Sequence, residues 1–382
     1  MDLPFSAFRP GDTQPQSWVE IGGASYGARP DEFGPIGGGP GYARIPAGGD
    51  HEAHDARSLL AALERARPGE VVYVRGAVEI DLTDRVLVDE LALRLPGGVT
   101  LAGERGRDGS PGALICSDEF RTSPLIRADG PDARVTGLRL RGPDPKRRLE
   151  FHRRVYYEGE GGEKAYYRFP NSGGIVADAD RLEVDNCEVS AWSHSGIYLR
   201  GGRGHRVHHC HVHHCQRMGL GYGVCLGPAE CVIERCLLCD NKHHVAGTGA
   251  PGCSYEASHN LVQSVEYPGG PQAHLLDMHG GEDRQDGTSI AGDHVLIRCN
   301  TFASPNMAVC IRGVPREGAE VSGNWFLFAE PPDDSMVERS GRRGYVDCPH
   351  HPFAAPQVVA GGNTRTHDNA WGRPPERPVV RP

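Results

Sequence analysis

The amino-acid sequence predicts an all-β protein folded as a right-handed parallel β-helix, a solenoid of stacked coils. The main observation is a repeat that returns about every two dozen residues from Val99 onward, with alternating apolar residues, a two-residue turn and then Cys or Asn. The second observation is composition, because 52 Gly and 30 Pro among 382 residues supply more turns than a helical protein tolerates. Stacked repeats lengthen a single core, so a chain of this length need not divide into separate globular domains.

The residue after each turn defines the repeat most clearly. Alternation of apolar and polar residues on both sides of it is typical of β-strands with one buried face. An Asn at this position can hydrogen-bond the backbone of the same turn one coil away, whereas a Cys fills the same space as a small apolar group. We therefore predict that these residues stack in one inward row, hereafter the ladder: Cys187, Cys210, Cys236, Asn260, Asn300 and Asn324.

A third short strand follows each copy, which gives three strands per coil. The open ends of such a cylinder expose strand edges that must be covered. Residues 55–66 predict an amphipathic helix that covers the N-terminal end, with Asp55 as its N-cap and Pro68 after its last turn. We expect an irregular segment over residues 1–55, the β-helix over residues 56–330, and a partial coil with a Pro-rich tail over residues 331–382.

Charge and hydropathy exclude several classes of partner. The net charge of −9 argues against binding to a nucleic-acid backbone. No apolar run approaches the ~18 residues of a membrane span, so we expect no membrane contact. Residues 1–10 lack the charged start and apolar core of a secretory signal, which predicts a cytoplasmic protein. In that compartment the 12 Cys are expected as buried, reduced thiols.

Three features together resemble the pectate-lyase-like superfamily of parallel β-helix proteins: the apolar strand 71–74, the strand and turn 99–103, and the ladder. The resemblance covers residues 56–328, most of the chain. That superfamily holds lyases, hydrolases, epimerases and non-catalytic adhesins, so the resemblance indicates a fold more than an activity. It implies that a saccharide would lie along the outer face of the strand that follows the ladder turn, between the flanking loops.

One interval of the repeat is much longer than the others. The step of 40 positions from Asn260 to Asn300 includes extra chain on both sides of the segment 274–279. Long loops in a regular scaffold are usually functional or disordered. We align Asp277 with a position that holds Leu or Ile in other copies, such as Leu199, so a polar side chain would replace a core residue. A replacement of this kind among titratable neighbours favours a functional site.

The segment 274–279 has basic residues in the adjacent coils. Lys242 opens the same strand one coil earlier and Arg312 closes it one coil later. Because stacked strands are ~4.8 Å apart, these side chains could converge. The Asp277-x-His279 element resembles that of mannuronan C5-epimerases and alginate-lyase-type enzymes, which also carry a Lys one or two coils earlier. Those enzymes have Tyr where this chain has His274, which leaves the identity of the general acid open.

The chemistry that these residues predict is removal of the proton next to a uronate carboxylate. It requires a base near neutrality, an acid, and a cation that neutralises the carboxylate. We expect His274 and His279 as acid and base, oriented by Asp277, with Lys242 or Arg312 as the cation. The expected partner is thus an acidic oligo- or polysaccharide, and no cofactor is required. Aromatic rings stack on sugars and Arg matches carboxylates. On this basis the expected substrate contacts are His243, His244, Glu256, Arg153, Arg154, Tyr156, Tyr157, Tyr166 and Tyr167.

Three alternatives remain open for the same segment. A glycoside hydrolase would need two carboxylates about 5–9.5 Å apart, and only Glu256 or Glu282 could pair with Asp277. A metal-dependent enzyme on a small molecule could bind Zn²⁺, or Ca²⁺ in the acidic loop around Glu282. In a non-catalytic saccharide-binding scaffold, the His and Asp side chains would only hydrogen-bond the backbone. The residues that could hold the metal are His243, His244, His274, Asp277 and His279.

A second His-rich stretch lies in the ladder region. Five of the seven residues from His208 to His214 are His. The repeat places Cys210 and Val212 inward, so the alternating His side chains face outward on a strand away from the expected groove. We interpret this stretch as a solvated His-rich strand that is able to bind metal ions adventitiously.

Overall fold

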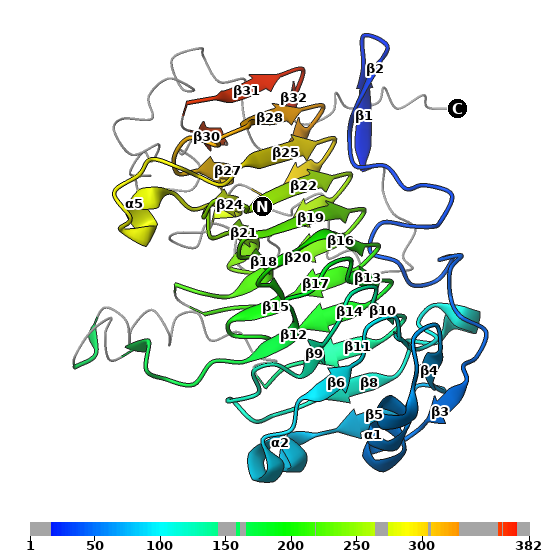
Figure 1. The fold of residues 1–382 in the computed structure, drawn as a ribbon. Coiled ribbons are helices and arrows are strands. Elements are labelled where there is room, and N and C mark those ends of the chain that lie inside the picture. The colour runs from blue at the N-terminus through cyan, green and yellow to red at the C-terminus, as the bar shows by residue number, and fades with distance from the viewer. Residues whose placement is uncertain are drawn as a thin grey trace, which may run out of the picture.

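The computed structural model of the chain describes residues 17–143, 158–160, 166–217, 219–263, 274–304, 307–327, 358–360 and 362–372. Across these residues three long parallel sheets stack strands along one axis (Figure 1). We number them in the order in which a coil visits them. Sheet 1 has 11 strands, sheet 2 has 10 and sheet 3 has nine. The predicted all-β parallel β-helix is therefore confirmed.

Sheet 1 consists of β3 (His51–Ala53), β4 (Val71–Val74), β7 (Thr100–Ala102), β10 (Arg134–Thr136), β13 (Glu183–Asp185), β16 (Gly202–His208), β19 (Ala229–Glu234), β22 (Ser254–Ser258), β25 (His294–Arg298), β28 (Gly318–Ser322) and β31 (Thr364–His367). Sheet 2 consists of β5 (Glu79–Asp81), β8 (Leu114–Cys116), β11 (Arg139–Arg141), β14 (Glu188–Ser190), β17 (His211–His213), β20 (Leu237–Cys239), β23 (Leu261–Gln263), β26 (Thr301–Ala303), β29 (Trp325–Phe326) and β32 (Ala370–Trp371). Sheet 3 consists of β6 (Leu93–Leu95), β9 (Ile126–Ala128), β12 (Gly173–Ala177), β15 (Ser195–Leu199), β18 (Tyr222–Leu226), β21 (His243–Gly247), β24 (His274–Met278), β27 (Met307–Ile311) and β30 (Val358–Ala360).

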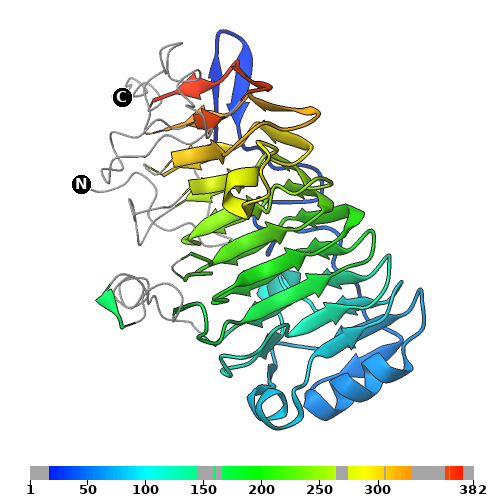
Figure 2. The same cartoon turned by 60° about the vertical axis from the view of Figure 1, so that its left-hand side comes forward.

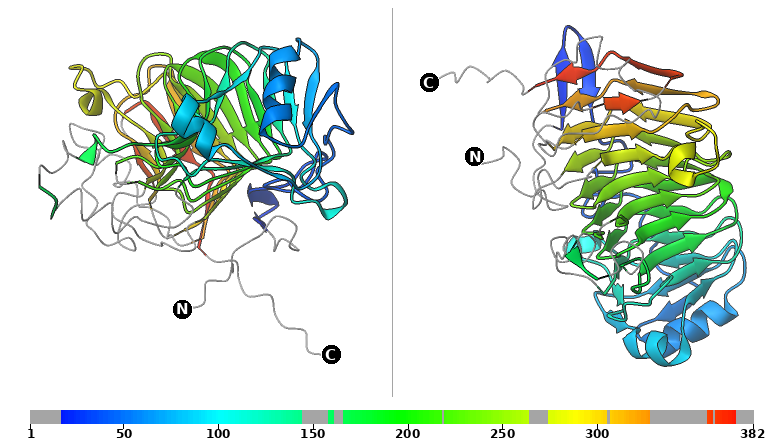
Figure 3. Two further views of the ribbon diagram at one scale, coloured as in Figure 1. Left: turned by 90° about the horizontal axis from the view of Figure 1, so that it is seen from below. Right: turned by 90° about the vertical axis from the view of Figure 1, so that its left-hand side faces the viewer.

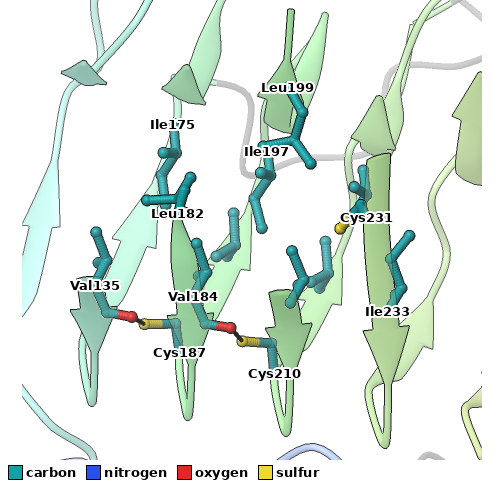
Figure 4. Packing of buried hydrophobic residues seen from close by; sticks show 14 of the residues in the cluster. Val135, Ile175, Leu182, Val184, Cys187, Ile197, Leu199, Cys210, Cys231 and Ile233 are labelled. Atoms are coloured by element: carbon teal, nitrogen blue, oxygen red, sulfur yellow. Dashed lines mark hydrogen bonds between the residues drawn. The ribbon is translucent and has the colours of Figure 1, made fainter. Parts of the chain in front are cut away.

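The ladder between sheets 1 and 2 is confirmed, since all six predicted side chains are fully buried. Asn300 shows the bonding pattern, because its Oδ1 accepts from Asn260 N at 2.9 Å and its Nδ2 donates to Ala257 O at 2.8 Å. In the Cys coils the thiol makes the weaker bond, and Cys187 Sγ donates to Val135 O at 3.5 Å (Figure 4). Where the residue before the ladder is not Gly, it has a left-handed backbone with φ of 49° to 54°, which closes the tight turn.

Helices cover the N-terminal end of the stack (Figure 3). Helix α1 (Ala56–Arg65) begins at Asp55, whose Oδ1 accepts from Ser58 N at 2.7 Å, and it buries Leu59 and Leu63 against the first coils. Helix α2 (Thr83–Asp89) lies at the same end. Two further short helical segments are η1 (Arg107–Gly109) and α5 (Gly281–Arg284). Among the described residues, no helix has the length and apolar character needed to cross a membrane.

Residues 17–50, hereafter the N-terminal strap, run along the outside of the stack. They begin beside the C-terminal coils with an antiparallel hairpin of β1 (Trp18–Ile21) and β2 (Ala24–Gly27). The chain then returns to β3 at the opposite end, as the blue trace in Figure 1 shows. Apart from the hairpin this Gly- and Pro-rich segment has little regular structure, but it is packed against the β-helix along much of its length.

The strap covers part of the outer face of sheet 2. Its Ala28 and Ile36 form an apolar cluster with Leu237 of β20 and Leu261 of β23. Sheet 2 contains the strand that follows the ladder turn, which is the face on which the superfamily resemblance would place a saccharide. In these coils that face is therefore occupied by the chain itself.

Most of the Cys residues are buried. No disulfide joins the 11 Cys in the part of the chain that the structure describes. Nine of them are buried, and Cys239 and Cys299 are half-buried. Burial raises the pKa of Cys116 to about 12, so its thiol stays protonated at neutral pH.

Candidate active site

The segment 274–279 lies on the outer face of sheet 3, where its register differs from the expected one. Asp277 pairs with Ala246 in the coil before and with Cys310 in the coil after, and Met278 fills the core position opposite Ile311. The alignment of Asp277 with core residues is therefore wrong by one residue, and a slip of one residue moves a side chain to the opposite face. The cause is local, because Leu275 and Leu276 both face the core where β24 begins.

Asp277 is fully buried although it lies on the outer face. Arg312 covers it, donating from Nε to Oδ1 at 3.0 Å and from Nη2 to Oδ2. His279 Nε2 lies 3.2 Å from Oδ2, and His274 Nδ1 lies 3.8 Å from the same oxygen. Burial alone would raise the pKa of Asp277, but Arg312 and His279 outweigh burial and hold it well below its usual value. The carboxylate is therefore a permanent anion that orients its neighbours.

Asp277, Arg312, His274 and His279 form a cluster, hereafter the cluster. Within it, His279 is the residue that solvent reaches most easily. Its side chain is 26% exposed, against 16% for Arg312 and 6% for His274. Its backbone N–H donates to Gly247 O at 2.9 Å, which fixes it at the end of β24. An imidazole held by a buried carboxylate, with one edge open to solvent, has the geometry of a general acid or base.

Arg312 is engaged by two carboxylates. Besides Asp277, its Nη1 donates to Asp283 Oδ1 at 3.1 Å. Asp283 belongs to the short helix α5, drawn in yellow beside sheet 3 in Figure 2, and its Oδ2 accepts from Gly280 N at 2.9 Å. Because its charge is already balanced, Arg312 is better placed to position Asp277 than to neutralise a substrate carboxylate. No sequence pattern predicts Asp283 in this role.

Lys242 and His243 extend the cluster toward the preceding coil. Lys242 Nζ lies 3.1 Å from His243 Nε2, and His243 Nδ1 donates to His274 O at 2.6 Å. Both side chains are buried. Burial, assisted by the Arg312 charge, lowers the pKa of Lys242 to about 7. Burial and Lys242 also place the pKa of His243 well below its usual value, so this imidazole is neutral.

Two expected contact residues lie outside the cluster. His244 turns away from the outer face, is fully buried, and faces Asn241 Nδ2 through its Nδ1 at 3.0 Å. Glu256 belongs to β22 of sheet 1, where Arg298 Nη2 donates to its Oε1 at 2.7 Å. His244 faces inward because side chains alternate between the two faces of a strand, and Glu256 is distant because it belongs to another sheet.

Two expected aromatic contacts, Tyr166 and Tyr167, differ in exposure. Tyr166 is buried beneath Arg217, whose guanidinium carbon lies 4.9 Å from the ring centroid, so this ring does not present a stacking surface. Tyr167 is 41% exposed. The expected contacts Arg153, Arg154, Tyr156 and Tyr157 lie outside the described residues.

A row of rings leads into the cluster along sheet 3. Tyr222 stacks on His243 with centroids 5.5 Å apart, and His243 lies 5.6 Å from His274. His194 meets Tyr222 edge-on at 5.9 Å. Tyr222 and His243 occupy one position of neighbouring strands, so the repeat itself was the signal that could have identified Tyr222.

Three residues of the cluster also have atoms that could bind a metal ion. One ligand atom each of His243, His274 and Asp277 lie within 4.8 Å of one another. However, Asp277 binds Arg312 through both oxygens, Arg312 Nη2 lies 3.1 Å from His274 Nδ1, and Lys242 faces His243 Nε2. Two cationic side chains therefore point at the atoms that would hold the ion. These residues do not fit a Zn²⁺ site in this arrangement.

A family model described as a right handed beta helix region matches residues 156–264. The chain is a right-handed parallel β-helix. No curated protein matches it. Among solved structures, an alginate lyase from Paenibacillus sp. str. FPU-7 is 14% identical, with a TM-score of 0.48 over 85% of this chain and 96% of that chain.

Two further solved structures are similar to the chain. The Dettilon tailspike protein is 12% identical, with a TM-score of 0.42 over 87% of this chain and 58% of its own. A family 28 exopolygalacturonase from Yersinia enterocolitica is 11% identical, with a TM-score of 0.42 over 85% of this chain and 63% of its own. Matches this distant do not indicate an activity, and the chemistry of the chain depends on the residues of the cluster.

Proposed function

We propose that the protein is a carbohydrate-active enzyme that acts on an acidic, uronate-containing saccharide by β-elimination or C5-epimerisation. The observation that carries this proposal is the contact series Arg312–Asp277–His279, in which the last member is the most exposed to solvent. Lys242, with a pKa of about 7, lies in the same cluster and supplies a second group that can change charge near neutrality.

The proposed reaction begins with removal of the C5 proton of a uronate unit by His279. The electron pair of the C5–H bond passes toward the carboxylate, whose charge the Lys242 ammonium balances. In elimination, that pair then forms the C4–C5 double bond while the C4–O bond breaks, and the leaving oxygen takes up the proton that His279 accepted. In epimerisation, a water molecule delivers a proton to C5 from the opposite face, and His279 releases its proton to the resulting hydroxide through solvent. Burial lowers the pKa of His274, so we assign it a positioning role.

The same geometry does not favour a glycoside hydrolase. That reaction needs one carboxylic acid that is protonated near neutrality beside a second carboxylate. Asp277 has a lowered pKa and is held by Arg312, which also binds Asp283. Glu256 lies on sheet 1 and cannot serve as the partner. Proton abstraction by an imidazole fits these groups better.

The test is a screen of uronate polymers, alginate and polygalacturonate among them, for the ultraviolet absorbance of unsaturated uronates. Polymers that give no absorbance change are incubated in D₂O and examined by NMR for exchange at C5, which reports epimerisation. His54→Ala is the matched control for the His279→Ala variant, because the His54 side chain is 72% exposed and lies just before α1. Binding without elimination or exchange on any polymer would favour a non-catalytic scaffold and contradict the proposal.

A further inference from the structure

The outer face of sheet 2 carries a second group of His and acidic side chains. Glu188 of β14 and His211 of β17 are direct register partners in adjacent coils. His213 lies two residues beyond His211, and the intervening Val212 is fully buried in the core, so both rings are on the outer face. Glu188, His211 and His213 are all partly exposed. Three side chains with metal-binding atoms therefore share one accessible patch, on a different sheet from Asp277.

The distances within this patch are close to those of a coordination site. One nitrogen from each ring and one oxygen of Glu188 lie within 4.8 Å of one another. His213 Nε2 is 3.5 Å from Glu188 Oε1, and the two rings stack with centroids 4.2 Å apart. In a tetrahedral site with bonds of about 2.0–2.1 Å, ligand atoms are roughly 3.3 Å apart. Small rotations of the side chains would bring the three atoms to that spacing.

His213 is oriented as a ligand would be. Its Nδ1 faces His214 Nδ1 at 2.8 Å, which fixes the ring from the side away from Glu188. Its Nε2 is buried and makes no hydrogen bond to the residues that the structure describes. Metal-ligating His residues commonly have their second ring nitrogen held in this way by a neighbouring group. The remaining nitrogen of His213 is thus directed at a carboxylate that does not satisfy it.

We propose that Glu188, His211 and His213 bind one divalent transition-metal ion of the kind that prefers imidazole ligands, such as Zn²⁺ or Ni²⁺. The ion would link β14 to β17 and keep one coordination position for water. With one carboxylate and two imidazoles, the patch offers too few oxygen ligands for Ca²⁺ or Mg²⁺.

The experiment is zinc titration of untagged protein that has been stripped with EDTA and dialysed, read by calorimetry and by elemental analysis. We expect one Zn²⁺ per chain, and an affinity that falls at least about tenfold in His213→Gln and in Glu188→Gln. His54→Gln, an exposed His away from the patch, should bind like the parent protein. Circular dichroism in EDTA checks that each variant keeps its β structure, and Glu188→Gln serves if a His variant does not fold.

Three results would overturn the proposal. The first is absence of zinc binding by the parent protein. The second is unchanged affinity in the folded Glu188→Gln and His213→Gln variants. The third is loss of binding in His274→Ala but not in His213→Gln, which would place the ion at the cluster on sheet 3.

Discussion

Two outer faces of this β-helix carry similar residues in different arrangements. On sheet 3, Asp277 is fully buried and accepts two hydrogen bonds from Arg312. On sheet 2, the Glu188 side chain is 33% exposed and faces His213 Nε2 at 3.5 Å, which is beyond hydrogen-bond contact. Both clusters place His and acidic side chains on neighbouring strands, so residue type alone does not separate them.

The difference lies in what occupies the space between the ligand atoms. A guanidinium between Asp277 and His274 excludes a metal ion and leaves one imidazole, His279, to exchange protons with a substrate. The Glu188 patch has no such donor between its ring nitrogens and its carboxylate among the contacts described, so an ion can complete it. The position of the nearest Arg side chain thus decides whether a cluster of His and acidic residues can transfer protons or bind a metal ion.

The largest expected effect is that of His279→Ala on turnover. Removing the one exposed imidazole should lower the rate on a uronate polymer by at least about 100-fold, the lower range for a general acid or base. The melting temperature should stay within a few degrees, because the side chain is partly exposed. Initial rates and thermal melts of this variant are compared with those of His54→Ala. A folded His279→Ala protein with the parent rate would remove His279 from the mechanism.

Asp277→Asn should affect both activity and stability. After this substitution Arg312 keeps its contact with the Asp283 carboxylate but loses the buried one. Breaking a buried ion pair of this kind costs about 3 kcal/mol. Turnover should fall as well, because His279 loses the group that orients it. Asp283→Asn is the matched comparison, since its side chain is 33% exposed and the loss of stability should be smaller. If Asp277→Asn is destabilised but keeps the parent rate per folded molecule, Asp277 is only structural.

The ladder was predictable from sequence because each copy contains its own marker. An Asn or Cys after a two-residue turn has one stable orientation, inward, since Asn260 and Asn300 must bond backbone groups that are buried. The marker repeats in six coils, so errors in one copy are corrected by the others. The capping helix was predictable for a similar reason, because Asp55 and its apolar face are local signals.

The register of the third strand and the course of the strap were not predictable in this way. Sheet 3 has no marker residue, and two consecutive core positions, Leu275 and Leu276, break the alternation that would reveal the phase. The strap has no periodicity, and its partners are distant in the sequence: Tyr42 Oη donates to Asp185 at 2.7 Å across 143 positions. Contacts of this kind depend on the assembled fold and leave no local pattern.

The pH dependence tests whether Lys242 acts as the cation of sheet 3. With a pKa of about 7, its ammonium is lost as the pH rises through neutrality, so the rate should fall on the alkaline side. Lys242→Arg keeps its charge and should extend activity to higher pH, at the cost of a changed position. Rate profiles between about pH 6 and 9 decide this. Identical alkaline limbs in the parent and the Arg variant would exclude Lys242 as the titrating group.

The pH dependence of stability should report the lowered pKa of Lys242 independently of activity. The pKa of Lys242 is lowered on folding, so the unfolded chain binds more protons between about pH 7 and its ordinary value near 10.5. The contribution of this residue to the free energy of unfolding therefore rises with pH through that window and is least favourable below pH 7. Lys242→Met should raise the melting temperature more at pH 6 than at pH 10. An equal change at both pH values would contradict the lowered pKa.

The smallest expected effect is the stabilisation of the folded chain by zinc, which should act on sheet 2 and not on sheet 3. If Glu188, His211 and His213 bind Zn²⁺, an ion at 100 times its dissociation constant stabilises the folded chain by about 2.7 kcal/mol. That gain should appear as a higher melting temperature in the parent protein and should disappear in His213→Gln. Turnover should be the same in EDTA and in zinc, because Arg312 and Lys242 point at the atoms of the sheet 3 cluster that a metal would need. Zinc that alters the rate in His213→Gln as strongly as in the parent protein would mean that the ion acts on sheet 3 and that the two clusters are not chemically distinct.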